Sequence, residues 1–182
     1  MTHTLEMHET FDCPRAVEDV FYYIADFSRI DEWDHTIIKA KKSSPGAIGL
    51  GTTFDLVIKS GFRSVPIEYQ ITHFEPGKKL VMSGRAATFT AIDTVTFSTT
   101  DTGCHVDWHA KLEFSGTAAK IIPFIEGRVK KAGIQTIKDL AVALRDQYPA
   151  PEASGLQKLA DKLVLPGMFG FTKYGYRHNA KQ

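Results

Sequence analysis

The sequence predicts an α+β protein, in which a curved antiparallel sheet of about seven strands wraps around one long C-terminal helix. Polar and apolar residues alternate through the middle of the chain, residues 35–114, and turn-forming residues separate the runs. Short connections of this kind join antiparallel neighbours, whereas parallel strands need long crossovers. A helical pattern then occupies residues 117–148. The strands therefore come first and the long helix last, with two short helices after the first strand.

The first strand and the two short helices occupy the first 33 residues. Residues 4–11 alternate and predict a strand. Pro14 suits the first turn of a helix, because the missing N–H of proline would have no partner there. Apolar residues follow at three- and four-residue spacing, as expected of an amphipathic helix: Ala16, Val17, Val20, Phe21 and Ile24. Asp26 can cap a second short helix, residues 27–32, that ends at Trp33.

The alternating region predicts six further strands, and the last element is a long amphipathic helix. We expect these strands at residues 35–42, 50–59, 64–75, 78–85, 88–99 and 104–114. Gly127 and Gly133 weaken the first half of the helix, because glycine is a poor helix former. Two explanations stay open. The helix bends or lets another group approach its backbone, or it packs closely on the sheet.

Residues 149–182 differ in pattern and predict an extension that follows a domain of residues 1–148. Five large apolar side chains lie close together in the extension: Met168, Phe169, Phe171, Tyr174 and Tyr176. Leaving so much apolar surface in water is unfavourable. We therefore expect the extension to dock on the domain or to form a homodimer, with membrane contact as the weaker alternative.

Charge and cysteine content argue against several classes of protein. The 22 Lys and Arg residues and the 21 Asp and Glu residues nearly cancel, so no strong field would attract nucleic acid. Cys13 and Cys104 are too few for a disulfide framework, and the N-terminus lacks the apolar segment of a signal peptide. We expect a cytoplasmic protein. No motif for a cofactor is present, and we predict none.

The alternation of side chains predicts which residues face the interior of the sheet. On one face of the last strand lies Trp108, and on one face of the preceding strand lie Phe97 and Asp93, among apolar residues. An isolated buried carboxylate is unfavourable, so Asp93 must find a donor or take up a proton. Asp93 is the candidate anchor or general acid/base for a ligand. The alternative is a structural Asp bonded to a neighbouring hydroxyl or arginine.

Four more residues are candidates for contact with a ligand. Phe54 belongs to an apolar strand face, and Tyr69 could offer its hydroxyl from another. Trp33 lies at a helix-to-strand junction, where it could line the mouth of a pocket or cover one end of the core. Arg85 could reach Asp93 if both residues share a face of the sheet.

Two histidines could in principle bind a metal ion from a single strand. His105 and His109 lie two residues apart, but a third ligand with suitable spacing is missing. Alternating charge on a solvated face explains them better, and we predict no metal site.

The order of elements and several short motifs resemble the SRPBCC superfamily, which includes START domains, Bet v 1-like proteins and polyketide cyclase/dehydrase-like proteins. The matching segments are Pro14 with Val17, Val20 and Phe21, Ala25-Asp-Phe-Ser-Arg-Ile-Asp-Glu-Trp33, Gly49-Leu-Gly-Thr-Thr-Phe54, Phe89-Thr-Ala-Ile-Asp93 and Val106-Asp-Trp108. The resemblance covers residues 1–148. It implies a helix-grip fold with a cavity for a hydrophobic ligand, and it does not specify a reaction.

These observations predict a protein that binds or transports a hydrophobic small molecule, such as a lipid, an isoprenoid or a polyketide-like compound. We expect an internal cavity of about 300 Å³ or more, lined by Trp108, Phe97 and Phe54. Two alternatives stay open. One is a cyclase or dehydratase that uses Asp93 with Tyr69 or Arg85, and the other is a module that binds other proteins.

Overall fold

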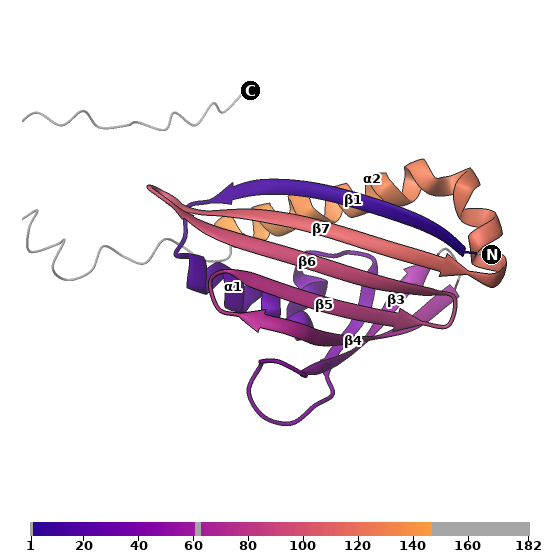
Figure 1. Ribbon diagram of the computed structural model, residues 1–182, viewed down its shortest axis with the longest axis horizontal. Coiled ribbons are helices and arrows are strands. Elements are labelled where there is room, and N and C mark those ends of the chain that lie inside the picture. Colours follow the sequence, from indigo (N-terminus) through magenta and orange to yellow (C-terminus); the bar gives the residue numbers. More distant parts are fainter. Residues whose placement is uncertain (1, 61–62, 147–182) are drawn as a thin grey trace, which may run out of the picture. The chain divides into compact units, whose positions relative to one another are not determined.

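The computed structural model describes residues 2–60 and 63–146 (Figure 1). The predicted extension, residues 149–182, lies outside the described residues, and so does its expected role in docking or dimer formation. Within the described part, no helix is long and apolar enough to cross a membrane.

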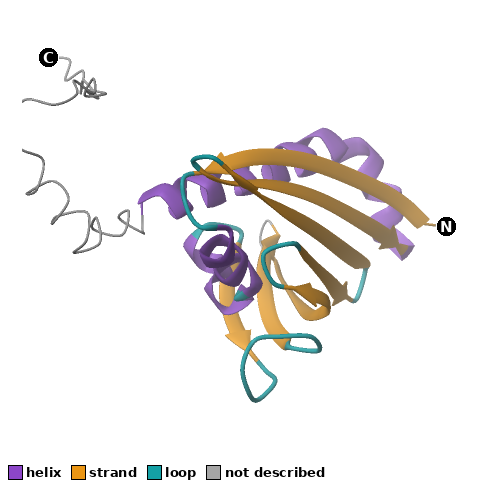
Figure 2. Cartoon of the chain, turned by 60° about the vertical axis from the view of Figure 1, so that its left-hand side comes forward, coloured by secondary structure: helices purple, strands orange, loops and turns teal. Residues whose placement is uncertain are grey.

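Seven strands of the described part form one antiparallel sheet in the order β1-β7-β6-β5-β4-β3-β2. Their bounds are β1 Thr2–Cys13, β2 Ile37–Lys42, β3 Thr53–Ser60, β4 Arg63–Glu75, β5 Lys79–Ala86, β6 Phe89–Thr100 and β7 Gly103–Ser115. Helix α1, Val17–Ala25, and the 3₁₀ helix η1, Phe27–Glu32, connect β1 to β2, and helix α2, Gly116–Asp146, ends the described chain. Figure 2 shows the sheet curving over these helices. The predicted α+β helix-grip fold is confirmed.

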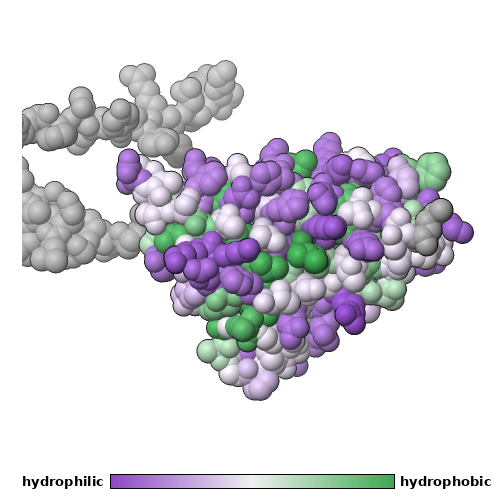
Figure 3. All heavy atoms as spheres, viewed as in Figure 1, coloured by the Kyte–Doolittle hydropathy of each residue, from purple (hydrophilic) through white to green (hydrophobic). Residues whose placement is uncertain are grey.

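The inward and outward faces of the sheet follow the predicted alternation. On β6 and β7 the buried residues are Ala91, Asp93, Val95 and Phe97, and Cys104, Val106, Trp108, Ala110 and Phe114. The neighbours between them point outward. Hydrophilic side chains accordingly spread over the face of the molecule in Figure 3, with apolar ones scattered among them.

The start of α1 differs from the prediction. Pro14 lies in a bend, where the Arg15 N–H donates to the Cys13 carbonyl oxygen at 2.9 Å, and the helix begins only at Val17. Asp26 caps η1 as expected, because its side chain accepts a hydrogen bond from the Ser28 N–H at 3.2 Å. Two local hydrogen bonds therefore fix the chain direction on both sides of α1.

The interior holds two clusters of buried apolar residues. The larger cluster packs α1, η1 and the end of α2 against the sheet, and the smaller one surrounds Leu5 and Phe114 at the start of α2. Met7, Phe89 and Leu112 are only partly buried and border both clusters. The region between the clusters is therefore where the packing is incomplete.

Candidate functional site

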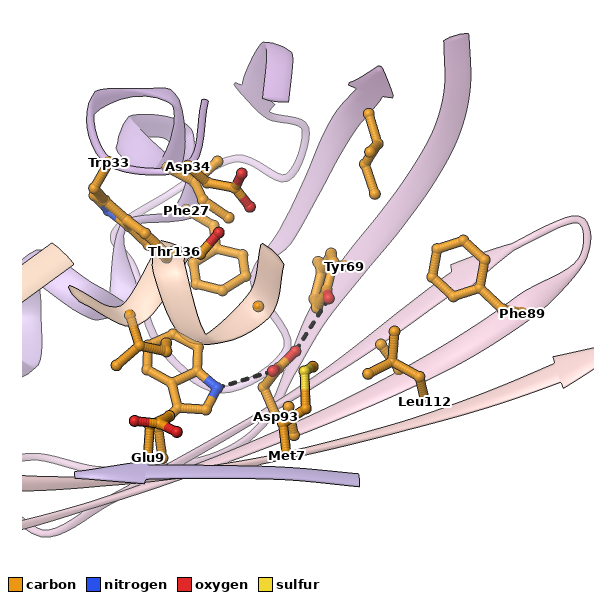
Figure 4. A pocket seen from close by; sticks show the side chains of 17 residues that line it. Met7, Glu9, Phe27, Trp33, Asp34, Tyr69, Phe89, Asp93, Leu112 and Thr136 are labelled. Carbon is orange, nitrogen blue, oxygen red and sulfur yellow. Dashed lines mark hydrogen bonds between the residues drawn. The ribbon is translucent and has the colours of Figure 1, made fainter. Parts of the chain in front are cut away.

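A pocket of about 190 Å³ lies in the incompletely packed region, between the inner face of the sheet, η1 and α2 (Figure 4). Its lining residues come from five strands, from both of these helices and from the residues that follow η1: Met7, Glu9, Phe27, Ile30, Trp33, Asp34, Ile58, Tyr69, Phe89, Ala91, Asp93, Trp108, Ala110, Leu112, Gly133, Thr136 and Ile137. Most are apolar or aromatic. Such a lining with a few polar groups is typical of sites for small organic ligands.

Asp93 lies at the centre of the polar part of this pocket, with an exposed fraction of 8%. The Tyr69 hydroxyl donates to Asp93 Oδ2 at 3.0 Å, and the Trp108 indole N–H donates to Oδ1 at 3.0 Å. Both bonds are visible in Figure 4. The inward position of Asp93 is as predicted. Asp93 accepts from a neighbouring hydroxyl, as in the structural alternative, and its second donor is a tryptophan and not an arginine.

The surroundings of Asp93 shift two acid–base equilibria. Burial raises the pKa of the Asp93 carboxyl, while the hydrogen bonds from Trp108 and Tyr69 oppose this shift and the charge of Asp34 adds to it. Burial, followed by the charge of Asp93, raises the pKa of Tyr69 well above its ordinary value. The tyrosine therefore stays protonated and keeps donating to the carboxylate.

Gly84 makes the contact between Tyr69 and Asp93 possible. The two residues lie on β4 and β6, with β5 between them, and Gly84 of β5 pairs directly with Tyr69. A Cβ atom at Gly84 would lie 2.7 Å from Tyr69 Cζ, inside van der Waals contact. The missing side chain lets the phenol ring lie across β5 and reach Asp93. We did not predict this role, although a glycine within an otherwise regular strand is a recognisable signal for a close approach.

Aromatic rings form much of the wall around the polar groups. Trp33 lies edge-to-face on Trp108 with ring centroids 5.9 Å apart, and Phe27 lies edge-to-face on Tyr69 at 5.1 Å. Trp33 is buried and still lines the pocket. Trp33, Tyr69, Asp93 and Trp108 are thus four predicted site residues that the fold brings together.

Three polar lining residues were missed from the sequence. Glu9 faces inward on β1, opposite Trp108 in the strand register. Asp34 follows η1, and its Oδ1 accepts from the Thr36 N–H at 2.9 Å, which fixes the carboxylate at the pocket. Thr136 contributes a hydroxyl from α2. The alternation on β1 could have identified Glu9, whereas the positions of Asp34 and Thr136 depend on tertiary packing.

Helix α2 approaches the sheet closely at Gly133. A Cβ atom there would lie within 2.4 Å of Met7 Sδ on β1. Gly133 also lines the pocket, so the short distance between α2 and β1 limits the depth of the pocket at this point. Of the two explanations for the glycines of this helix, close packing on the sheet holds for Gly133.

Three other predictions need correction. Phe54 and Phe97 are buried in the solid core and do not line the pocket, because α1 and η1 fill the space in front of them. Arg85 is exposed, pairs with Glu68 in the strand register and lies on the outer face, one residue out of phase with Gly84. It therefore cannot reach Asp93. The pocket is also smaller than the predicted 300 Å³.

His105 and His109 lie on the outer face of β7 among acidic residues. His105 Nδ1 lies 2.7 Å from Asp12 Oδ1, and His109 Nε2 lies 3.6 Å from Glu6 Oε2. These contacts agree with the interpretation of a charged, solvated face.

The sheet, the long helix and the pocket between them define a helix-grip protein. A family model described as polyketide cyclase / dehydrase and lipid transport matches residues 4–144, and the chain belongs to this family. The resemblance to the SRPBCC superfamily is thereby confirmed. No curated protein matches the chain.

Solved structures share the fold at low sequence identity. An uncharacterized protein from Rhizobium leguminosarum is 10% identical, with a TM-score of 0.61, over 79% of this chain and 96% of its own. Ara h 8.0201 is 12% identical, with a TM-score of 0.58, over 79% of this chain and 98% of its own. The di-domain ARO/CYC protein StfQ of the steffimycin biosynthetic pathway is 11% identical, with a TM-score of 0.60, over 79% of this chain and 51% of its own. These similarities concern the fold alone.

Proposed function

We propose that the protein binds a small hydrophobic molecule in the pocket under α2. The size of this molecule would be about that of a single ring or of two fused rings. The observation that carries the proposal is an unfilled pocket of about 190 Å³ with aromatic walls. An engineered apolar cavity of about 150 Å³ is large enough to bind benzene. The volume thus suits compact ring compounds better than long-chain lipids or large polycyclic molecules.

A variant that fills the pocket tests this proposal. Ala110 lines the pocket from β7, and Ala110→Trp would occupy the space that a ligand needs. Ile92→Trp is the matched control, because Ile92 lies on β6 with 47% of its surface exposed on the outer face. The chain contains two tryptophans, Trp33 and Trp108, and both line the pocket. Their indole N–H signals in an NMR spectrum therefore report on occupancy.

The expected result is that a ring compound such as 1-naphthalenemethanol shifts both indole signals in the natural protein and in the Ile92→Trp control. In Ala110→Trp its affinity should fall by about tenfold or more, with the fold retained. Equal affinity in both folded variants would place the binding site elsewhere. No shift in any protein would refute the proposed function.

A second candidate is an enzyme of the cyclase or dehydratase type, and one specific observation favours it. Asp93 is a buried carboxyl with a raised pKa at the wall of a mostly apolar pocket, as expected of a residue that transfers protons. However, Tyr69 and Trp108 both donate to Asp93 itself. An enolate oxygen would need donors of its own, so the geometry supports binding better than catalysis.

The enzymatic candidate can be tested without knowledge of the natural substrate. 2-Tetralone is a bicyclic ketone, and its α-protons exchange with deuterium when a base removes them. A protein that uses Asp93 as a base should accelerate this exchange in D₂O, and Asp93→Asn should abolish the acceleration. An exchange rate equal to that in buffer would remove this candidate and leave the binding function in place.

A further inference from the structure

Most of the polar groups that face the pocket are hydrogen-bond acceptors, and two of its donors are already used. Of the donors in the wall, the Tyr69 hydroxyl and the Trp108 N–H both point to Asp93. A carboxylate has about four acceptor sites, so Asp93 can still accept further hydrogen bonds. The remaining side-chain donors of the wall are the Thr136 hydroxyl and the Trp33 indole N–H. A ligand that only accepts hydrogen bonds would find few partners here.

The charges around the pocket have one sign. Glu9, Asp34 and Asp93 all line it, and in the described part of the chain no Lys, Arg or His does. The negative charge of Asp34 raises the pKa of both Asp93 and Tyr69, which is an electrostatic interaction between groups that line the same pocket. A ligand with a negative charge would be repelled, and a positive charge would relieve the repulsion between the carboxylates.

The aromatic walls also favour a positively charged ligand. Trp33, Trp108 and Phe27 lie around the acidic residues, and the faces of such rings attract cations. Phe89 and Leu112 lie on the other side of the pocket, away from Trp33 and Asp34 in Figure 4. The pocket thus has an acidic, aromatic side and an apolar side.

We infer that the pocket selects compact aromatic molecules that carry a hydrogen-bond donor, above all a protonated amine, and rejects carboxylates. The ring would lie against Phe89 and Leu112, and the donor would reach Asp93 and Asp34. This inference rests on the proposed binding function and specifies the class of ligand.

Four probes with the same ring system test the inference. They are 1-naphthylmethylamine, 1-naphthalenemethanol, 1-methylnaphthalene and 1-naphthoate, which carry at neutral pH a cation, a neutral donor, no polar group and an anion. We expect affinity, measured by calorimetry and by the indole NMR signals, to fall in that order. The amine should bind about tenfold or more tightly than 1-methylnaphthalene, as expected for a charge-assisted hydrogen bond.

Asp93→Asn should change the order of affinities in a specific way. The Trp108 N–H can donate only, so it would bind the amide oxygen of the new side chain, and the amide NH₂ would then donate to Tyr69. This exchange frees the Tyr69 hydroxyl as a donor toward the ligand. The amine should lose most of its advantage, and naphthoate should gain affinity relative to 1-methylnaphthalene.

Two further variants keep the test valid if Asp93→Asn does not fold. Asp34→Asn retains an oxygen that can accept from Thr36, and Glu9→Gln has nearly the same shape as the natural side chain. Each removes one negative charge from the pocket, so each should reduce the preference for the amine over naphthoate by several-fold. Glu68→Gln, on the outer face of β4, is the control and should leave the preference unchanged.

The outcomes distinguish a failure of the inferred ligand preference from a failure of the proposed binding function. If all four probes bind with similar affinity, or naphthoate binds most tightly, the inference is wrong and the binding function stands. If the preference exists but survives both Asp34→Asn and Glu9→Gln, the pocket charges do not cause it and the inference is again wrong. If no probe moves the indole signals, the binding function and the inference both fail.

Discussion

The two halves of the interior are built on the same strands but filled to different degrees. Under α1, Phe21 and Phe97 lie with ring centroids 5.2 Å apart, and Phe21 is fully buried. Under α2, the same sheet leaves a pocket of about 190 Å³. Small residues line it from three elements, namely Ala91, Ala110 and Gly133. The comparison indicates that the sizes of a few inward-facing side chains, as well as the curvature of the sheet, create the space.

The largest difference between the halves should appear when a phenylalanine is truncated in each. Phe21→Ala removes a fully buried ring from the solid half and should lower the free energy of unfolding by about 3–5 kcal/mol. Phe89→Ala removes a half-buried ring at the pocket, where solvent-accessible space already exists, and should lower it by only about 1–2 kcal/mol. Urea unfolding of both variants measures the difference. Equal losses would mean that the pocket is packed as tightly as the core.

Gly84→Ala should disturb the polar side of the pocket and leave the solid half intact. The new methyl group would lie 2.7 Å from Tyr69 Cζ, so the ring must move and its hydrogen bond to Asp93 is lost. We expect a loss of about 1–3 kcal/mol in unfolding free energy, because a buried carboxylate loses a partner.

Tyr69→Phe is the matched variant for this prediction. It removes the same hydrogen bond without the steric conflict at Gly84, so it should show the part of the loss that comes from Asp93 alone. If Gly84→Ala were as stable as the natural protein, the close approach of Tyr69 to β5 would not matter for the site.

The two glycines of α2 should respond in opposite directions to the same substitution. Gly127 has open space around it, so Gly127→Ala should raise the free energy of unfolding by up to about 1 kcal/mol through higher helix propensity. At Gly133 the new methyl group would meet Met7 Sδ, and the displaced methionine would enter the pocket. Gly133→Ala should therefore lack this gain and bind ring compounds more weakly. Thermal unfolding and calorimetry check both effects.

The smallest expected effect is a pH dependence of the folding stability that comes from Asp93 in the pocket. The pKa of Asp93 is raised in the folded protein above its ordinary value of 3.8, so the folded state binds the proton more tightly than the unfolded state. The stabilisation is fully present below the unfolded pKa and is lost as the pH rises through the folded pKa. Relative to Asp93→Asn, the natural protein should gain stability as the pH falls from 7 toward 4. A constant difference between the two proteins over this range would contradict the raised pKa.

The sequence predicted the fold well because local patterns specify it. Alternation identified the inward faces of β6 and β7, including Asp93 and Trp108, and the capping residue Asp26 identified the start of η1. Which inward residues meet empty space could not be predicted in the same way. Phe97 and Ala91 face the same side of β6, and only the position of α1 decides that one is covered by core and the other by the pocket.

Long-range contacts explain the remaining differences. The face of Arg85 was left conditional, because its strand ends close to a hairpin, where a shift of one residue reverses the side, and the structure places Arg85 on the outer face. Asp34 and Thr136 are distant from Asp93 in sequence, and they come to the same pocket only when η1 and α2 dock on the sheet. Sequence patterns within a strand carry no information about such encounters.

A crystal structure under xenon pressure would test most directly whether one half of the interior is open and the other solid. Xenon enters apolar cavities that are empty and cannot enter a close-packed core. We predict xenon density between Met7, Ala110 and Leu112, and none between Phe21, Phe54 and Phe97. A pocket without xenon, in which neighbouring side chains have closed over Ala91 and Gly133, would contradict the account.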